Sequence, residues 1–175
     1  MSTVVDRAAP PAGTTSFFQV GYVVPDLAAA IGFFTETLGA PPFFVIEDVE
    51  LSDLYFRGKP FAPRESIAFA YLGHLQFELV QPLAGGDPST YTEFLDRNPG
   101  GGVHHVATHV AAIDQGLADL GVDESAIVQT GRFGEATRFA YLDIATPTGA
   151  MLEIVQLDEP ALQMFEALRR GELRA

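Results

Sequence analysis

Four polar residues are the first candidates for chemistry in this sequence: Gln19, Glu78, His105 and Glu153. A buried carboxylate is costly unless it is paired, hydrogen-bonded or bound to a metal ion. The sequence around the two glutamates offers no evident cationic partner, and a divalent cation would remove that cost. One imidazole nitrogen, one amide oxygen and two carboxylates form a mostly oxygen donor set that suits Zn, Ni, Co or Mn, with water completing the sphere. We therefore expect these four residues to bind a divalent metal ion.

Such a site would favour one type of reaction. A cation beside a carbonyl oxygen stabilises the negative charge that develops when the neighbouring carbon loses a proton. A nearby carboxylate can serve as the base. The four residues thus predict metal-assisted proton abstraction next to a carbonyl, with Glu153 and Glu78 as catalytic residues, leading to isomerisation, epimerisation or elimination.

An internal repeat aligns these candidates with one another. Residues 69–72 and 139–142 both read Phe-Ala-Tyr-Leu, and each copy precedes a Glu-(Leu/Ile)-Val-Gln segment that contains Glu78 or Glu153. The longer spacing in the second copy is explained by the turn-forming residues 145–149. Gln19 and His105 stand at the starts of corresponding first strands, so the chain contains two copies of one unit.

Each copy is expected to fold as one strand, one helix and three further strands. The expected strands span 17–24, 42–48, 65–72 and 75–82 in the first copy and 103–110, 126–132, 137–143 and 150–157 in the second. The expected helices span 27–38, 91–97, 113–120 and 160–173. Asp26 can cap the start of the first helix, and Gly39 and Gly121 can end the two module helices.

The fold class that follows is α+β, with two tandem βαβββ modules forming a curved, cup-like mixed sheet and the helices outside. The expected divisions are a flexible leader at 1–15, a first module at 16–83, a connector at 84–102, a second module at 103–158 and a C-terminal helix at 159–175. Because one module alone leaves a sheet face bare, we expect the two modules to share that face.

Strand alternation decides which side chains enter the cup. His74 and Gln76 share the face of Glu78, and His109 shares the face of His105, so these three residues are candidates for the substrate pocket. His109 could carry protons behind the ligands, contact the substrate, or be a structural histidine that is hydrogen-bonded deeper in the cup.

Composition excludes several other functions. The formal charge of −13, with Lys59 as the only lysine, makes binding to nucleic acid or another phosphate backbone untenable. The absence of cysteine excludes disulfides and thiolate ligands. No apolar run reaches the roughly 18 residues of a membrane span, and the N-terminus lacks a signal-peptide core. We therefore expect a cytoplasmic protein without a membrane partner, and the high apolar content predicts a homodimer.

The sequence resembles the vicinal-oxygen-chelate superfamily, also called the glyoxalase/bleomycin-resistance/dioxygenase group. The resemblance rests on residues 19–27 (Gln-Val-Gly-Tyr-Val-Val-Pro-Asp-Leu), on residues 102–107 (Gly-Val-His-His-Val-Ala) and on the two glutamate strands, and it covers about residues 16–157. The order Gln, Glu, His, Glu resembles zinc-type glyoxalase I, which implies a metal-dependent lyase or isomerase. It also implies that Glu153 can leave the metal and shuttle a proton.

The substrate is expected to differ from that of glyoxalase I. Glutathione carboxylates call for basic residues at the pocket mouth, and the four arginines that could serve are not aligned with any motif: Arg57, Arg64, Arg132 and Arg138. Many aromatic residues are expected near the pocket instead, namely Phe17, Phe43, Phe44, Tyr55, Phe56, Phe61, Phe69 and Tyr71. They favour a small apolar or aromatic substrate.

Two other functions remain open. The protein could be a non-catalytic binding protein like the antibiotic-resistance members, for which the acidic surface would favour a cationic ligand. It could also be an extradiol-type dioxygenase, although the resemblance would then call for a histidine at the position of Gln19.

Overall fold

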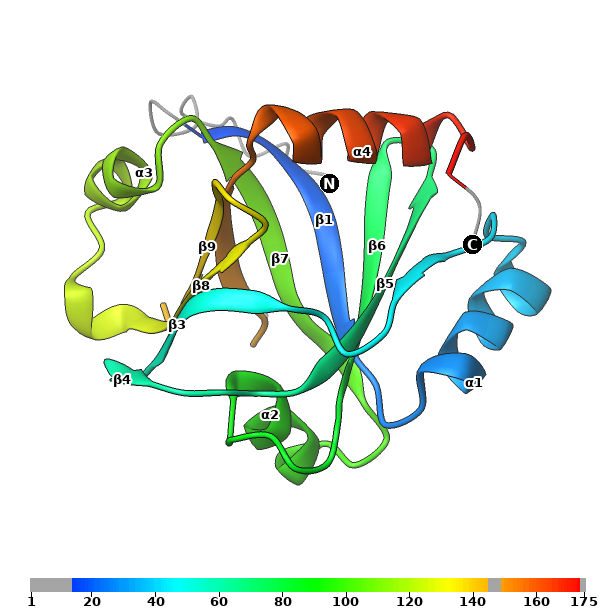
Figure 1. Ribbon diagram of the computed structural model, residues 1–175, viewed down its shortest axis with the longest axis horizontal. Helices are drawn as coiled ribbons and strands as arrows, with labels where there is room; N and C mark the ends of the chain where they lie inside the picture. The colour runs from blue at the N-terminus through cyan, green and yellow to red at the C-terminus, as the bar shows by residue number, and fades with distance from the viewer. Residues whose placement is uncertain (1–13, 145–148, 174–175) are drawn as a thin grey trace, which may run out of the picture.

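The computed structural model describes residues 14–144 and 149–173, which form a strongly curved sheet with helices around it (Figure 1). The expected leader therefore lies almost wholly outside the described residues, and so does most of the turn expected at 145–149. None of the helices in the described part of the chain is long and apolar enough to cross a membrane.

Within the described residues, ten strands form one mixed sheet in the order β2-β5-β6-β1-β7-β10-β9-β8-β3-β4. Their bounds are β1 Thr14–Val23, β2 Phe44–Ile46, β3 Leu51–Phe56, β4 Lys59–Pro60, β5 Glu65–Leu72, β6 Leu75–Pro82, β7 Gly102–Val110, β8 Ile127–Phe133, β9 Thr137–Leu142 and β10 Met151–Gln156. The predicted α+β class and the cup-like mixed sheet are confirmed.

The two halves of the sheet meet at β1 and β7, which pair antiparallel. On either side of this seam the arrangement repeats, because β6 runs parallel to β1 and β10 runs parallel to β7. Both modules therefore belong to one chain, and the cup is complete without a second copy. The expected homodimer is not needed to build it and stays a prediction.

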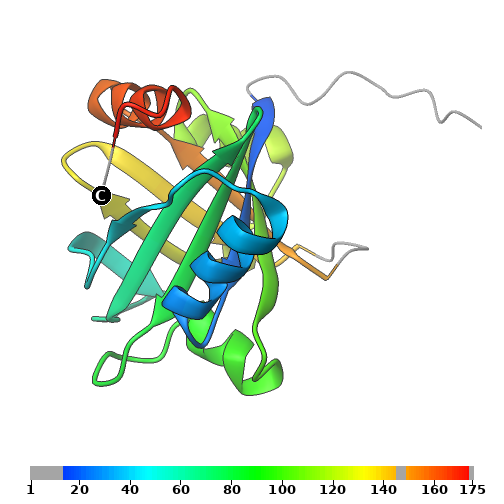
Figure 2. The same cartoon turned by 90° about the vertical axis from the view of Figure 1, so that its right-hand side faces the viewer.

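Helices surround the cup, two on its outer face and two at its ends. They are α1 Leu27–Gly32, continued by a π-helical turn at Phe33–Thr37, then α2 Thr90–Arg97, α3 Ile113–Leu120 and α4 Glu159–Arg169, with a 3₁₀ turn at Glu124–Ala126. In Figure 2 the α1 segment lies flat against the outer face of β5 and β6, while α4 crosses one end of the cup and α2 the other.

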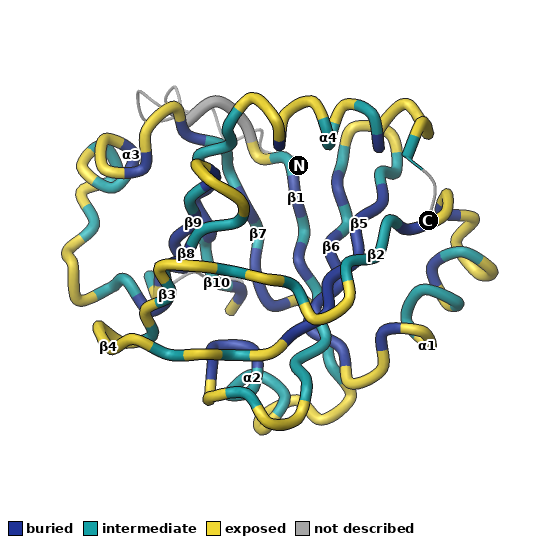
Figure 3. The backbone as a smooth tube through the Cα atoms, in the orientation of Figure 1, coloured by how far each residue is buried: buried dark blue, intermediate teal, exposed yellow. Residues whose placement is uncertain are grey.

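The strand alternation used above holds in both halves. Leu79 packs with Leu27 and Phe34 on the outer side of the first half. On the outer side of the second half, Ile154 packs with Ile113. The intervening polar positions of β6 and β10 are thereby turned into the cup, and Figure 3 shows the central strands as the most buried part of the chain.

Two parts of the fold differ from the expectation. The first-module helix continues past Gly32 as a π-helical turn, and Gly39 ends the segment with a φ of 68°. Strands β3 and β4 were not expected at all. They extend from the first module to the far edge of the sheet, where β3 pairs antiparallel with β8 of the second module.

Candidate metal centre

The structure brings the predicted ligands together at the seam between the two modules. Ligand atoms of Glu78, His105 and Glu153 all lie within 4.8 Å of one another, and all three residues are buried. Nε2 of His105 is 2.9 Å from Oε2 of Glu78 and 3.4 Å from Oε2 of Glu153. Gln19, which is 4 % exposed, faces the same cavity as the two glutamates.

The register of the central strands places a small residue opposite every one of these side chains. Gly21 lies across from His105 on β7 and from Glu78 on β6. Ala107 lies across from Gln19 on β1 and from Glu153 on β10. The same pattern on both sides of the seam is the structural form of the sequence repeat, and it makes room for four large polar side chains at one point.

Three atoms of the cluster have no hydrogen-bond partner although they are buried: Oε1 of Gln19, Oε2 of Glu78 and Nε2 of His105. Oε2 of Glu78 is close to the imidazole but is not aligned for a hydrogen bond with it. Buried polar atoms are rarely left without partners. The ligand atoms of Glu78, His105 and Glu153 lie close enough together to bind one divalent cation, and the unpartnered oxygen of Gln19 is a fourth possible donor.

Gln76, which lies opposite Gln19 on the neighbouring strand β6, holds the Gln19 amide in place by a hydrogen bond. Nε2 of Gln19 donates a hydrogen bond to Oε1 of Gln76 (2.6 Å), and Nε2 of Gln76 donates to the hydroxyl of Tyr71 (3.1 Å). These two bonds hold the amide nitrogen of Gln19 and leave its buried oxygen without a hydrogen-bond partner. Gln76, predicted as a pocket residue, thus supports Gln19 and does not itself line the cavity.

The structure does not bring the other two predicted pocket residues to the cluster. His74 lies exposed between β5 and β6. His109 is half-buried on β7, opposite Val155 of β10. Neither residue lines the cavity that Gln19, Glu78 and Glu153 line.

A cavity of about 570 Å³, including the part open to solvent, extends from the cluster into the cup. Its walls are mostly apolar and aromatic, namely Phe18, Val49, Leu51, Ile67, Phe69, Phe133, Phe139, Val155, Leu157 and Phe165. Of the aromatic residues expected near the pocket, only Phe69 lines it. Its polar lining beyond the cluster consists of Glu65, Tyr91, Thr137 and Tyr141.

Glu65 is the residue that the sequence prediction missed. It is 3 % exposed, its Oε2 has no hydrogen-bond partner, and it lines the cavity together with Glu78 and Glu153. The signal was present in the sequence, because the two-residue period of β5 puts Glu65 on the same face as Ile67 and Phe69, which also line the cavity.

Burial changes the proton affinities in the site. Burial and the charge of Glu78 raise the pKa of Glu65 to about 8. Burial likewise raises the pKa of Glu153 to about 8, with Glu78 adding to the effect and His105 and a hydrogen bond with Tyr141 opposing it. For His105, burial disfavours the charged ring, but the carboxylates of Glu78 and Glu153 outweigh this and raise its pKa. The metal-free cluster therefore holds protons that a cation would displace.

Residues 18–141 match the family described as the Glyoxalase/Bleomycin resistance protein/Dioxygenase superfamily. The chain belongs to this superfamily. The match includes three of the four candidate ligands. The fourth, Glu153, follows it in the sequence, on strand β10 of the same sheet.

Similar proteins in this superfamily are epimerases. The chain is 32 % identical to 2-epi-5-epi-valiolone epimerase of Actinomyces sp over 161 residues, which is 88 % of this chain and 85 % of that protein. It is 37 % identical to mitochondrial methylmalonyl-CoA epimerase of Mus musculus over 102 residues, or 58 % of this chain. The chain spans about half the length of the methylmalonyl-CoA epimerases of Mus musculus, Homo sapiens and Bos taurus that it matches.

Solved structures agree in fold. Methylmalonyl-CoA epimerase from Mycobacterium tuberculosis superimposes with a TM-score of 0.58 at 22 % identity, covering 89 % of this chain and 97 % of the other. A hypothetical protein from Bacillus halodurans superimposes with a TM-score of 0.56 at 19 % identity, covering 82 % of this chain and 95 % of the other.

Proposed function

We propose that this protein is a divalent-metal-dependent epimerase or isomerase that moves a proton on a carbon next to the carbonyl group of an uncharged substrate. The observation that carries the proposal is the buried cluster of Gln19, Glu78, His105 and Glu153, which contains three unpartnered polar atoms and borders a mostly apolar cavity. The similarity to epimerases over most of the chain favours epimerisation over the lyase reaction of glyoxalase I.

A bound cation would supply charge stabilisation beside the substrate carbonyl and so acidify the neighbouring C–H bond. Gln19, Glu78 and His105 would hold the ion. Glu153 would serve as the base, because it lies beside His105 and a cation held there would favour its deprotonated form, which burial alone disfavours.

Epimerisation also needs a proton returned to the other face of the same carbon. Glu65 is suited to this role because it lines the cavity from β5, whereas Glu153 does so from β10, and the strands β6, β1 and β7 lie between them. Both side chains line one cavity of a strongly curved sheet, so a substrate bound there can lie between them. Burial favours the protonated form of Glu65 near neutral pH, so its carboxyl group can donate the returning proton.

The substrate is expected to carry no negative charge. The described residues that line the cavity include three glutamates and no lysine or arginine. The arginines considered at the sequence level are engaged elsewhere: Arg57 with Glu93, Arg64 with Asp48, Arg132 with Asp53 and Arg138 with Asp114. A hydroxyketone that directs its polar end at the cluster and a ring or alkyl body at the aromatic walls fits this lining.

The test is hydrogen exchange at the carbon next to the carbonyl, followed by NMR in deuterated water. The metal-loaded protein is incubated with 2-epi-5-epi-valiolone, with 2-hydroxycyclohexanone and, as an anionic comparison, with methylmalonyl-CoA. We expect metal-dependent exchange with an uncharged ketone that is lost in Glu153→Gln. Exchange with methylmalonyl-CoA alone would contradict the substrate class, and unimpaired exchange in Glu153→Gln would contradict the assigned base.

A further inference from the structure

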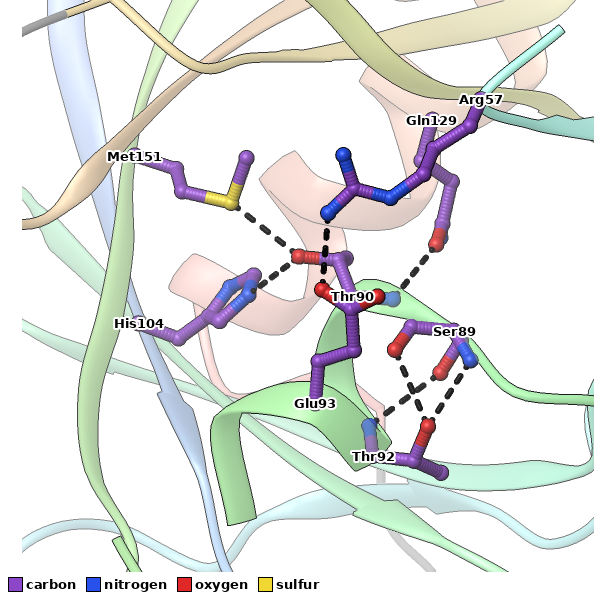
Figure 4. Close-up of polar contacts among 8 residues, drawn as sticks. All are labelled: Arg57, Ser89, Thr90, Thr92, Glu93, His104, Gln129 and Met151. Carbon is purple, nitrogen blue, oxygen red and sulfur yellow. Dashed lines mark hydrogen bonds and ion pairs between the residues drawn. The ribbon is translucent and has the colours of Figure 1, made fainter. Parts of the chain in front are cut away.

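A buried chain of hydrogen bonds leads from helix α2 to the back of His105. Oγ1 of Thr90 lies 3.0 Å from Nε2 of His104 (Figure 4), and Nδ1 of His104 lies 3.0 Å from Nδ1 of His105. Thr90, His104 and His105 are 4 %, 2 % and 0 % exposed. The chain ends at the imidazole whose other nitrogen, Nε2, faces the two glutamates.

Met151 determines which group donates in the hydrogen bond between Thr90 and His104. Thr90 has one hydroxyl proton, and it is donated to Sδ of Met151 at 3.1 Å, as the dashed contact in Figure 4 shows. A thioether accepts hydrogen bonds but cannot donate them. With its proton directed at Met151, Oγ1 of Thr90 accepts a hydrogen bond from His104, and in this arrangement the proton of His104 lies on Nε2.

The surroundings of His104 keep its ring neutral. The ring packs against the aromatic rings of Tyr91, Phe94 and Tyr141 as well as against His105. A neutral imidazole has one N–H group and one acceptor nitrogen. With the proton on Nε2, the acceptor is Nδ1, and it can bond to His105 only if His105 donates from its own Nδ1.

We propose that Thr90 and His104 are positioning residues that hold the proton of His105 on Nδ1, so that Nε2 presents a lone pair to a divalent cation. Metal-binding histidines usually donate their second ring N–H to an oxygen acceptor. Here a neighbouring histidine is the acceptor, and its own orientation is set by a threonine and a methionine. The inference depends on the proposed function only for the role of that lone pair.

Thr90 is held firmly enough for this task. It is the first residue of α2, directly after the N-cap residue Ser89, which exchanges hydrogen bonds with Thr92 in a capping box. The backbone N–H of Thr90 also donates to Oε1 of buried Gln129 on β8, at 3.2 Å. Helix α2 is thereby anchored to the second module, and its first residue meets His104.

Three variants test the role of the hydrogen bonds that join Thr90, His104 and His105. His104→Leu removes the acceptor, whereas His104→Asn keeps an acceptor oxygen in place of Nδ1, and exposed His74→Leu is the matched control. Affinity for Co²⁺ is measured by calorimetry. We expect roughly 10–100-fold weaker binding in His104→Leu, as is usual when the partner of a metal-bound histidine is lost. His104→Asn should recover most of the affinity, and His74→Leu should not change it.

The proton position is measured independently of metal binding. Long-range ¹H–¹⁵N spectra of the metal-free protein, at an alkaline pH where His105 is neutral, should show its proton on Nδ1 in the wild type. A proton on Nε2 would overturn the proposal. So would unchanged Co²⁺ affinity in folded His104→Leu, or no recovery in folded His104→Asn. If the wild type binds no metal, the proposed function fails, while the spectra still decide the tautomer.

Discussion

Gly21 of β1 lies directly beneath the imidazole ring of His105 on β7. A methyl group at position 21 would overlap with Cε1, Nε2 and Nδ1 of that ring, so only glycine leaves room for the imidazole at this position. Strand β1 therefore contributes to the cluster in two ways. Gln19 supplies an amide oxygen, and Gly21 leaves the space that the imidazole ring occupies.

Gly21→Ala should therefore displace His105. We expect Co²⁺ affinity to fall at least tenfold, together with a loss of about 1–3 kcal/mol in the free energy of unfolding from overpacking. Calorimetry and denaturant unfolding measure the two effects. Gly32→Ala in α1 is the control, because a methyl group there meets no atom within 4 Å, and it should leave metal affinity unchanged.

Glu65→Gln should separate catalysis from metal binding. The variant keeps the shape of the side chain and removes an ionisable group that is not among the ligands, so we expect metal content to stay at the wild-type level. Turnover of the epimerised substrate should fall by about 10²–10⁴-fold, the usual contribution of an acid–base group. Wild-type turnover in a metal-loaded Glu65→Gln protein would remove Glu65 from the mechanism.

Stability of the metal-free protein should decrease as the pH rises. The pKa values of Glu65 and Glu153 are raised from 4.5 to about 8 on folding, so the folded state binds more protons than the unfolded state between these values. These two carboxyl groups then lower the free energy of unfolding as the pH rises across this window, and the raised pKa of His105 acts in the same direction. The lowered pKa values of His104 and His109 act in the opposite direction below pH 6.5, so the decrease should be clearest above that pH.

Thermal unfolding at a series of pH values checks this dependence. The decrease should be smaller in Glu65→Gln, and smaller again when a divalent cation is added, because the cation compensates the carboxylates. A metal-free protein that becomes more stable between pH 6.5 and 8 would contradict the assigned shifts.

Gln76→Leu should weaken metal binding although Gln76 does not line the cavity. It removes the acceptor for Nε2 of Gln19, which leaves a buried amide without a partner and costs about 1–3 kcal/mol. We expect roughly 10-fold weaker binding of Co²⁺ because the Gln19 oxygen loses its orientation. Tyr71→Phe, which leaves the bond between the two glutamines in place, should have a smaller effect.

Much of the fold follows from local patterns in the sequence. Strands β5 and β6 and helix α3 begin and end at the predicted residues, because alternation and an end glycine define them. The inward direction of Glu78 and Glu153 follows from the apolar residues beside them, which pack under α1 and α3.

Strand β3 could not be predicted in the same way. Its side chains are half-buried or exposed, and Asp53 within it has a φ of 49° at a break in the pairing with β8. The strand forms because β8 offers an edge, and this long-range pairing leaves little trace in the local sequence. Glu65 was missed for a related reason, since it follows Arg64 and resembles half of a surface ion pair, whereas Arg64 pairs with Asp48.

The most direct test of the metal centre is the metal content of the purified protein, measured by elemental analysis beside a His105→Ala/Glu153→Ala double variant. Both proteins are first incubated with Mn²⁺, Co²⁺, Ni²⁺ or Zn²⁺ and then freed of unbound ions. We predict about one equivalent of bound metal in the wild type and its loss in the folded double variant. A wild-type protein that retains none of the four ions would contradict the account and leave the cup as a site for ligand binding without metal catalysis.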